Sequence, residues 1–494
     1  MTRARTIFAR VTLIVALGLM GCASAPLLGG TAREIASPTV ANAQGGHDGG
    51  EASADPGADP TVTEAPLRQS PPVQASERPR VVIGTILGLV LLLGLAYVGG
   101  HPRVEQFERS LGISQAITAG FPFVALGALA RASGVLTVDT LSLLGPLLRF
   151  GLGWIGFILG VRFNARALEA APKGLGVLVT MRALVTSALI VGGAMLLRSL
   201  TRGPGEAAIS DVVFLRDALV LGTAGGLTSH AVPARLRARG DEESSVELVS
   251  SALQLEGLSG VVGLLFIASY FRPRDVEVAW HMPGTAWLLL ALGLGAAMGI
   301  ITYTVFRQGP ARGPGATVLT IGSVAFAAGM AGNLRLSSVV TCFVAGLFLA
   351  NAPGDYRLRL AETLERLERP IYLLFLAVVG AIWRVGTWRE WALMAIFVVS
   401  RLGGKFLGTR VGSERSGLSL TDDARRALSV APMGALPLAI VVSAMLLYPG
   451  ESVAHLVTAI LGGAIVTEVL VQALTRGAKT AASAPPVTTN PGAP

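Results

Sequence analysis

Residues 251–266 read SALQLEGLSGVVGLLF, an apolar run in which the one charged residue is Glu256. The run lies inside a longer apolar segment, 246–270, which is long enough to cross a lipid bilayer. Glu256 is ten residues into this segment, about 15 Å along a helix and hence near the bilayer centre. A charged side chain at that depth costs about 2.5 to 3.5 kcal/mol on the mildest insertion scale, so Glu256 is a candidate functional residue.

The rest of the chain also has the composition of a multi-pass membrane protein. Of its 494 residues, 52% are hydrophobic and 14% are charged, and apolar runs of about 20 residues recur along most of the sequence. The net charge of +9 does not predict a nucleic-acid partner, because the arginines stand singly or in small groups in short loops. Catalytic triads, zinc-ligand spacings and phosphate-binding glycine loops are not recognisable, so we predict no enzyme, no cofactor and no resident metal.

The two ends of the chain differ from its middle. Residues 1–25 predict a signal segment, because arginines precede the apolar stretch VTLIVALGLMG and small residues follow it. LMGC, which ends at Cys22, is similar to a bacterial lipobox, so lipidation of Cys22 competes with an uncleaved anchor, another cleavage site or a misplaced gene start. Residues 26–79 predict a disordered extracytoplasmic tail, and 476–494 predict a disordered cytoplasmic tail.

Between the tails, in the region 81–475, we predict about thirteen transmembrane helices. Their ranges are 81–99, 112–131, 141–161, 174–197, 211–230, 246–270, 283–306, 316–332, 335–351, 370–383, 390–410, 424–447 and 453–475. Loops on one side carry more than twice as many Lys and Arg residues as loops on the other, which predicts an extracytoplasmic N-terminus and a cytoplasmic C-terminus in the inner (plasma) membrane. Thirteen helices suit two inverted-topology repeats of six helices joined by one more.

Two predicted helices that stand seven apart in this order are interrupted by glycine and proline. The first contains GTAGGLTSHAVP (222–233), and the second contains SVAPMGALPLAIV (429–441). Either interruption alone is weak, since glycine and proline are common in membrane helices. Together they predict crossed broken helices with an ion site at the unwound backbone near the midplane.

The polar groups inside the predicted membrane region are the candidates for that site. Those predicted to bind the ion and the proton are Glu256, Thr228 and Ser229, with Arg401 as a supporting charge at a similar depth. The secondary candidates are Glu468, Asp217 and His230. Arg149, Arg182 and Lys405 are expected to pair with Asp217 or to extend toward the membrane surface. A static pair of Glu256 and Arg401 that only joins two helices is the structural alternative.

Four segments, taken in order, resemble the monovalent cation:proton antiporter superfamily, the sodium/proton and potassium/proton exchangers. They are LLGPLLRFGLGWIGFILGVRF (143–163), LVLGTAGGLTSHAV (219–232), LSSVVTCFVAGLFLAN (336–351) and RPIYLLFLAVVGAIW (369–383). The resemblance covers roughly residues 81–475. It implies a mobile core domain, in which the broken helices cross near Glu256, and a scaffold that forms a homodimer. It also implies a monovalent cation and a proton as substrates.

The sequence departs from the family pattern at the implied site. The family's Asn-Asp or Asp-Asp pair matches Leu255 and Glu256, so one apolar residue and one glutamate stand there. The family's glutamate after Gly-Leu is Arg162 here, whereas Arg401 falls where relatives carry Lys or Arg. One titratable acid predicts electroneutral exchange of sodium or potassium for a proton around Glu256.

Two other functions stay open. The first is a non-transporting membrane receptor or scaffold on a degenerate antiporter fold, in which Glu256 is only a structural partner of Arg401. The second is a gated potassium efflux channel, although we recognise no soluble nucleotide-binding domain after residue 475.

Overall fold

The computed structural model describes most of the chain from residue 120 onward. The described residues are 120–132, 144–163, 171–201, 211–237, 240–272, 282–308, 314–353, 356–383, 386–448 and 451–482, with Gly94 and Glu169. Within them the structure has fourteen helices and no strand, which agrees with the predicted all-helical fold. The signal segment, Cys22, the tail before residue 80, most of the first predicted span and residues 483–494 lie outside the described residues. Residues 476–482, predicted to belong to a disordered tail, continue the last helix.

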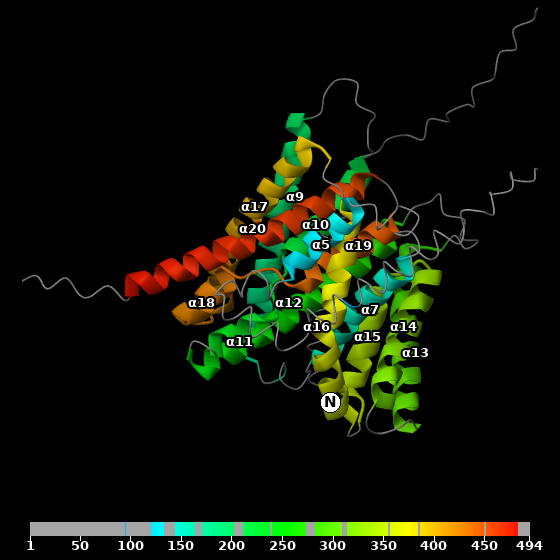
Figure 1. Cartoon of the computed structure of the whole chain (residues 1–494). Coiled ribbons are helices and arrows are strands. Elements are labelled where there is room, and N and C mark those ends of the chain that lie inside the picture. Colours follow the sequence, from blue (N-terminus) through cyan, green and yellow to red (C-terminus); the bar gives the residue numbers. More distant parts are fainter. Residues whose placement is uncertain are drawn as a thin grey trace, which may run out of the picture.

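The described helices form two groups, which we name the scaffold bundle and the core bundle (Figure 1). The scaffold bundle consists of α5 (Phe121–Ala132), α7 (Gly145–Arg162), α13 (Gly284–Gln308), α14 (Pro314–Asn333), α15 (Ser338–Asn351) and α16 (Tyr356–Ile382). The core bundle consists of α9 (Leu175–Thr201), α10 (Asp211–Gly225), α11 (Val232–Arg237), α12 (Glu243–Tyr270), α17 (Trp388–Ser416), α18 (Asp422–Ser429), α19 (Ala435–Leu447) and α20 (Glu451–Ala482).

Glycines let the scaffold helices approach until backbones touch. A Cβ atom added to Gly160 of α7 would lie 2.2 Å from the carbonyl oxygen of Phe343 in α15. A Cβ atom on Gly127 of α5 would lie 1.9 Å from the carbonyl oxygen of Ala377 in α16. Two helix pairs are thus joined by the same kind of contact, as inverted repeats would require. The repeats themselves stay a prediction.

One helix begins well before its predicted start. α16 starts at Tyr356, whereas hydropathy predicts a span from residue 370. Its first half is rich in charged residues, but Leu360 and Leu364 stand four residues apart and are both buried. This half is therefore an amphipathic helix that continues through Pro370 into the apolar half.

The core bundle is built on a close contact between α9 and α17, which lie side by side in Figure 1. Glycine recurs every fourth residue on one face of α17, at Gly404, Gly408 and Gly412. Cβ atoms at the first two would lie 2.6 and 2.8 Å from the Cα atoms of Thr186 and Arg182 in α9. Small residues at this spacing are what close packing of membrane helices requires.

Both predicted interruptions are present, and the two unwound segments meet. One runs from the end of α10 at Gly225 to Val232, and the other from the end of α18 at Ser429 to Ala435. The amide of Ser229 donates a 2.9 Å hydrogen bond to the carbonyl of Pro432. A Cβ atom on Gly434 would lie 3.1 Å from the Cα atom of Ser229, so a larger residue there would crowd the crossing.

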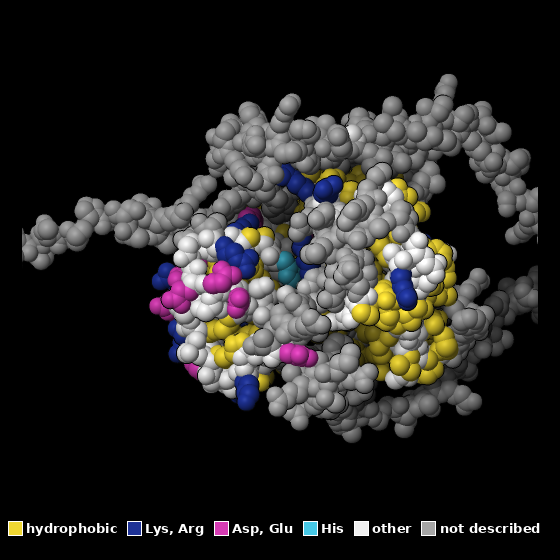
Figure 2. Space-filling view, turned by 90° about the horizontal axis from the view of Figure 1, so that it is seen from below, with side chains coloured by type: hydrophobic (Ala, Val, Ile, Leu, Met, Phe, Trp, Pro, Cys, Tyr) yellow, Lys and Arg dark blue, Asp and Glu magenta, His cyan; other side chains and the backbone are white. Residues whose placement is uncertain are grey.

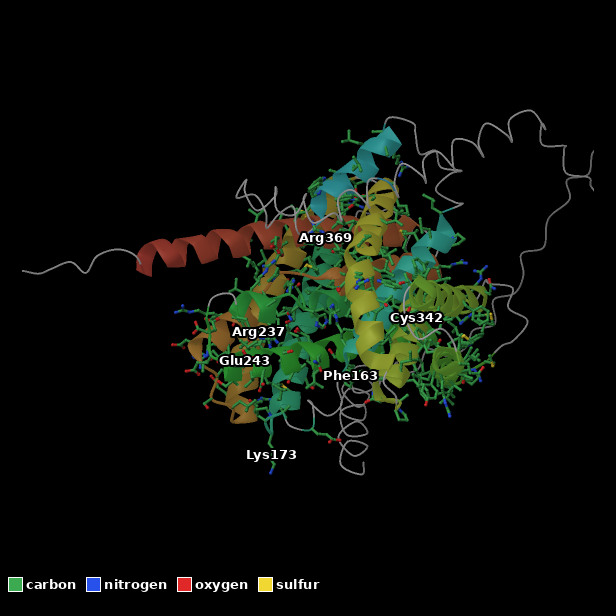
Figure 3. All side chains as sticks on the ribbon, turned by 60° about the horizontal axis from the view of Figure 1, so that its bottom comes forward. Phe163, Lys173, Arg237, Glu243, Cys342 and Arg369 are labelled. Atoms are coloured by element: carbon green, nitrogen blue, oxygen red, sulfur yellow. The ribbon has the colours of Figure 1, made fainter. Side chains whose placement is uncertain are left out.

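The surface matches a chain that crosses a membrane several times. In the described part, five helices are long and apolar enough to span a bilayer. Exposed apolar residues such as Leu289, Val318 and Phe326 lie on α13 and α14, and Figure 2 shows hydrophobic side chains gathered on that side. Charged side chains gather on the other side, around α11 and α18. There Arg237 and Glu243, which are labelled near each other in Figure 3, form an ion pair at 3.0 Å.

Candidate ion site at the crossing of the broken helices

Glu256 lies beside the crossing and is almost completely buried. Its side chain is 1% exposed, and the carboxylate forms a hydrogen-bonded ion pair with the Lys405 ammonium of α17. The same ammonium donates to the carbonyl of Gly226 and, at 2.9 Å, to the hydroxyl of Thr228. A carboxylate, a backbone carbonyl and a hydroxyl therefore converge on one cationic nitrogen at the first break.

Two buried arginines complete the cluster. Arg182 of α9 lies 3.5 Å from Glu256 and donates a 2.7 Å hydrogen bond to the carbonyl of Leu428, at the end of α18. Arg401 of α17 donates to the carbonyls of Leu227, at 2.9 Å, and Ala431, at 3.4 Å. Arg401 is thus bound to both unwound segments. The structural alternative requires a direct ion pair between Glu256 and Arg401, and Arg401 does not form that pair.

The cluster has more positive than negative side chains. Among the residues that the structure describes, Arg182, Arg401 and Lys405 face one carboxylate, and all four groups are buried. The carbonyls that accept from these cations lie where α10 and α18 end. Helix C-termini carry about half a negative charge each. The two helix ends therefore offset much of the excess positive charge.

One oxygen of Glu256 is left without a hydrogen bond. Oε1 contacts Lys405 and Arg182, whereas the buried Oε2 has no hydrogen-bond partner among the residues that the structure describes. Buried carboxylate oxygens are nearly always satisfied. This acceptor, together with the oxygens of Gly226 and Thr228, has the chemistry of a site for a hard cation.

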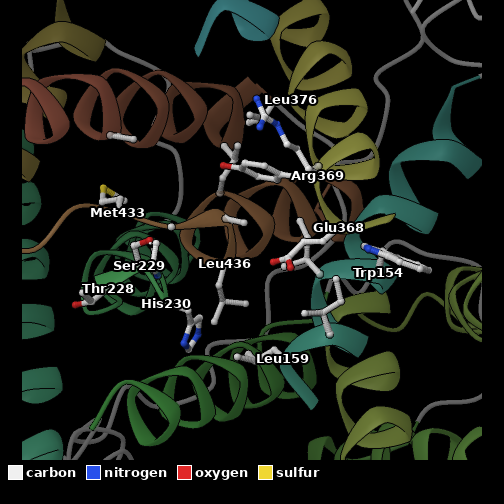
Figure 4. Close-up of a pocket in the computed structure, with 18 of the residues that line it drawn as sticks. Trp154, Leu159, Thr228, Ser229, His230, Glu368, Arg369, Leu376, Met433 and Leu436 are labelled. Atoms are coloured by element: carbon white, nitrogen blue, oxygen red, sulfur yellow. Dashed lines mark hydrogen bonds between the residues drawn. The ribbon is translucent and has the colours of Figure 1, made fainter. Parts of the chain in front are cut away.

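A cavity of about 600 Å³ leads toward this cluster from between the two bundles. Thr228, Ser229 and His230 line one wall, and Trp154 and Leu159 of α7 line another (Figure 4). Thr228 belongs both to the cavity wall and to the hydrogen bonds of Lys405. Thr228 therefore connects the cavity with the buried ion pair.

Two ion pairs stand at the same cavity. Arg162 of α7 pairs with Glu368 of α16 at 2.5 Å, within the scaffold bundle. Arg235 of α11 pairs with Glu468 of α20 at 3.2 Å, within the core bundle. The wall of the cavity therefore contains charged groups from both bundles as well as apolar ones.

The structure separates the residues proposed from sequence. Glu256 and Thr228 lie in the buried cluster, Ser229 lies at the crossing, and His230 lies in the cavity wall. Asp217 pairs with its neighbour Arg216, about 14 Å along α10 from the break. That secondary candidate therefore stands apart from the crossing.

The direct partners of Glu256 are Lys405 and Arg182, whereas the sequence predicted that both pair with Asp217 or extend toward the membrane surface. A pattern for Lys405 was available, because it follows Arg401 by four residues and so lies on the same helix face. The glycines at 404, 408 and 412 adjoin this face and predict that it packs against another helix. Arg182 has no comparable pattern around it.

Crossed broken helices around buried charges in a multi-pass membrane protein define the class of secondary transporters. The family model described as "Sodium/hydrogen exchanger, transmembrane" matches residues 119–477, and the chain belongs to this family of cation/proton exchange transporters. A comparison with curated proteins gives no match.

A solved structure supports the fold. The chain is similar to the sodium proton antiporter MjNhaP1 from Methanocaldococcus jannaschii at pH 8, with 15% sequence identity and a TM-score of 0.55. The likeness covers 79% of this chain and 97% of that one. At this identity the comparison establishes a common architecture.

Proposed function

We propose that the protein exchanges a monovalent cation, sodium or potassium, for a proton by alternating access around Glu256. The observation that carries the proposal is the position of the Lys405 ammonium, which contacts Glu256, Gly226 and Thr228 at once. Unwound carbonyls and a carboxylate are the groups that coordinate alkali cations in transporters of this plan. A cation that binds these oxygens displaces the ammonium, and Lys405 releases its proton.

The same arrangement supports electroneutral exchange. With Lys405 protonated, the cluster holds one removable positive charge, and with a bound cation and neutral Lys405 it holds the same charge. Arg182 and Arg401 keep their protons in both states, because guanidinium groups do not titrate in proteins. One proton therefore moves against one cation without net charge transfer, whether the proton leaves from Lys405 or from Glu256.

The proposal is tested by exchange in vesicles that contain the purified full chain. Addition of sodium, potassium or lithium chloride to acid-loaded vesicles is expected to move protons outward for at least one of these cations, whereas choline chloride is not. An imposed membrane potential at constant pH gradient should leave the rate unchanged. A rate that follows the potential would show that net charge moves.

A non-transporting receptor or scaffold is the second candidate. It is favoured by the excess of buried cations, which hold Glu256 in a closed set of contacts. The same vesicles separate the two functions, because this candidate predicts no proton movement with any of the three cations.

We further propose an extracytoplasmic N-terminus and a cytoplasmic C-terminus in the inner membrane, with two copies of the chain associated through their scaffold bundles. The distribution of Lys and Arg between the loops supports the orientation. A reporter fused after residue 476 should be active only in the cytoplasm, and activity on the other side would reverse the orientation.

Native mass spectrometry of the purified chain should give the mass of a dimer.

A further inference from the structure

A second cavity, of about 360 Å³, lies between the two bundles at the end opposite to the first. Both cavities are lined by α7 and α19. The second is lined by Arg149 of α7 and Ser443 of α19, whereas the first reaches Arg162. Arg149 and Arg162 are thirteen residues apart, about 20 Å along the helix. The second cavity therefore belongs to the opposite membrane face.

This cavity has a positive lining. Arg149 and Arg335, which lies in the turn between α14 and α15, both line it, and none of the described residues in the lining carries a carboxylate. Neither guanidinium has a hydrogen bond or ion pair with the residues that the structure describes. The other polar side chains in the wall are Asn333, Ser338 and Ser443.

The backbone holds both arginines in position. A Cβ atom on Gly332 would lie 2.7 Å from Cδ and 3.0 Å from Nη1 of Arg149, so the glycine makes room for that side chain. Arg335 has a φ of 51°, in the left-handed region where a helix end normally carries glycine. Its amide donates to the carbonyl of Gly332 at 3.1 Å. An arginine in this conformation is strained by about 1 kcal/mol.

A third arginine adds to the positive charge near the turn. Arg272 donates a 3.1 Å hydrogen bond to the carbonyl of Leu334 and lies 3.4 Å over the ring of Trp287. Burial lowers the pKa of Arg272, and the charge of Arg335 lowers it further. Positive charge is thus concentrated at the opening of the second cavity, in a protein whose family transports cations.

We propose that this cavity binds a phosphate-type anion, held by Arg149 and Arg335. A guanidinium offers paired N–H donors that match two oxygens of a phosphate, so two of them can bind one group from two sides. The Ser443 hydroxyl is 2.9 Å from that of Ser337, so core and scaffold touch in this wall. The anion therefore binds where the two bundles meet. Its source is either inorganic phosphate in the outer aqueous phase or the headgroup of an anionic phospholipid.

The free-phosphate arm uses the full chain in detergent without phospholipid. Inorganic phosphate replaces chloride at constant ionic strength and sodium, and binding is followed by thermal unfolding and by radiolabelled phosphate. The double variant R149Q/R335Q should weaken binding about tenfold or more. Gly332→Ala should also weaken it, although both arginines remain. Arg307→Gln, at an exposed arginine on α13, is the control and should bind like the wild type.

The lipid arm compares nanodiscs of neutral phospholipid with nanodiscs that also contain phosphatidylglycerol. Native mass spectrometry counts the anionic lipids that remain on the wild type and on R149Q/R335Q. Loss of phosphate binding in the double variant identifies free phosphate, and loss of retained lipid alone identifies the headgroup. Equal phosphate binding and equal lipid retention by both proteins would overturn the proposal, provided that the double variant unfolds at the wild-type temperature in chloride. If the double variant unfolds at a lower temperature than the wild type, Gly332→Ala replaces it in both measurements. Equal phosphate binding and equal lipid retention by Gly332→Ala and the wild type would then overturn the proposal.

Discussion

Replacing Glu256 by glutamine is expected to reduce cation-dependent proton movement to the level of vesicles without protein. Glutamine keeps the size and polarity of the side chain but has no charge, so it cannot hold a cation against two buried arginines. It also leaves Lys405 without its counter-ion. The measurement is proton movement in vesicles after addition of sodium or potassium, at equal amounts of inserted protein.

Glu243→Gln is the matched control, because Glu243 lies at the exposed start of the same helix and pairs only with Arg237 in the described structure. This variant should exchange ions at the wild-type rate. Wild-type exchange by Glu256→Gln would contradict the role of Glu256 and make Glu468 the next acid to test. Loss of activity in both variants would point to damage to α12 in general.

Stability separates the chemical role of Glu256 from its structural one. Removing one partner of a buried ion pair costs about 3 to 5 kcal/mol of unfolding free energy. The double variant E256Q/K405Q removes both partners and should recover part of that loss while remaining inactive. Recovery of transport together with stability would show that the acid is only structural.

Arg401→Met is expected to lower the free energy of unfolding by about 2 to 6 kcal/mol, because two buried acceptors lose their donor, and to abolish exchange. Arg401 is fully buried and donates to carbonyls of both unwound segments. Methionine fills the space but leaves the carbonyls of Leu227 and Ala431 without this donor. Denaturant unfolding in detergent and vesicle exchange are the two measurements.

Arg410→Met on the same helix is the control for this variant. Arg410 is 71% exposed at its side chain and pairs with Glu414 four residues later. Exposed pairs of this kind contribute less than about 1 kcal/mol, so the control should unfold near the wild-type denaturant concentration. Equal stability of the two variants would show that Arg401 does not hold the crossing together.

Much of the fold follows from hydropathy and from the two interruptions. Long apolar runs predict the membrane helices, and glycine with proline at 222–233 and 429–441 predicts where two of them unwind. Hydropathy did not predict the start of α16, because the mean hydropathy of an amphipathic, charge-rich helix is as low as that of a loop. The period of its leucines would have predicted the helix.

The sequence predicted how deep the site residues lie in the membrane, but not the direction in which their side chains point. Glu256 lies ten residues into its predicted span and hence near the midplane, and Arg401 was its expected partner because it lies at a similar depth. Depth does not specify which way a side chain points. Arg401 contacts the unwound backbone, while Lys405, one turn further on, contacts the acid. The pairing of Arg235 with Glu468 joins residues more than two hundred positions apart, which no local pattern predicts.

The glycines at 404, 408 and 412 bring α17 into close contact with α9 along one face. Backbone contact between α9 and α17, together with the arginines that both helices extend to the two breaks, leaves the coordinating oxygens little freedom relative to one another. Under the proposed alternating access, these oxygens would move together as one rigid unit, and a cation would meet the same set of oxygens on either side of the membrane. Changes within that unit would then alter affinity, whereas changes at the surface between the two bundles would alter the turnover rate.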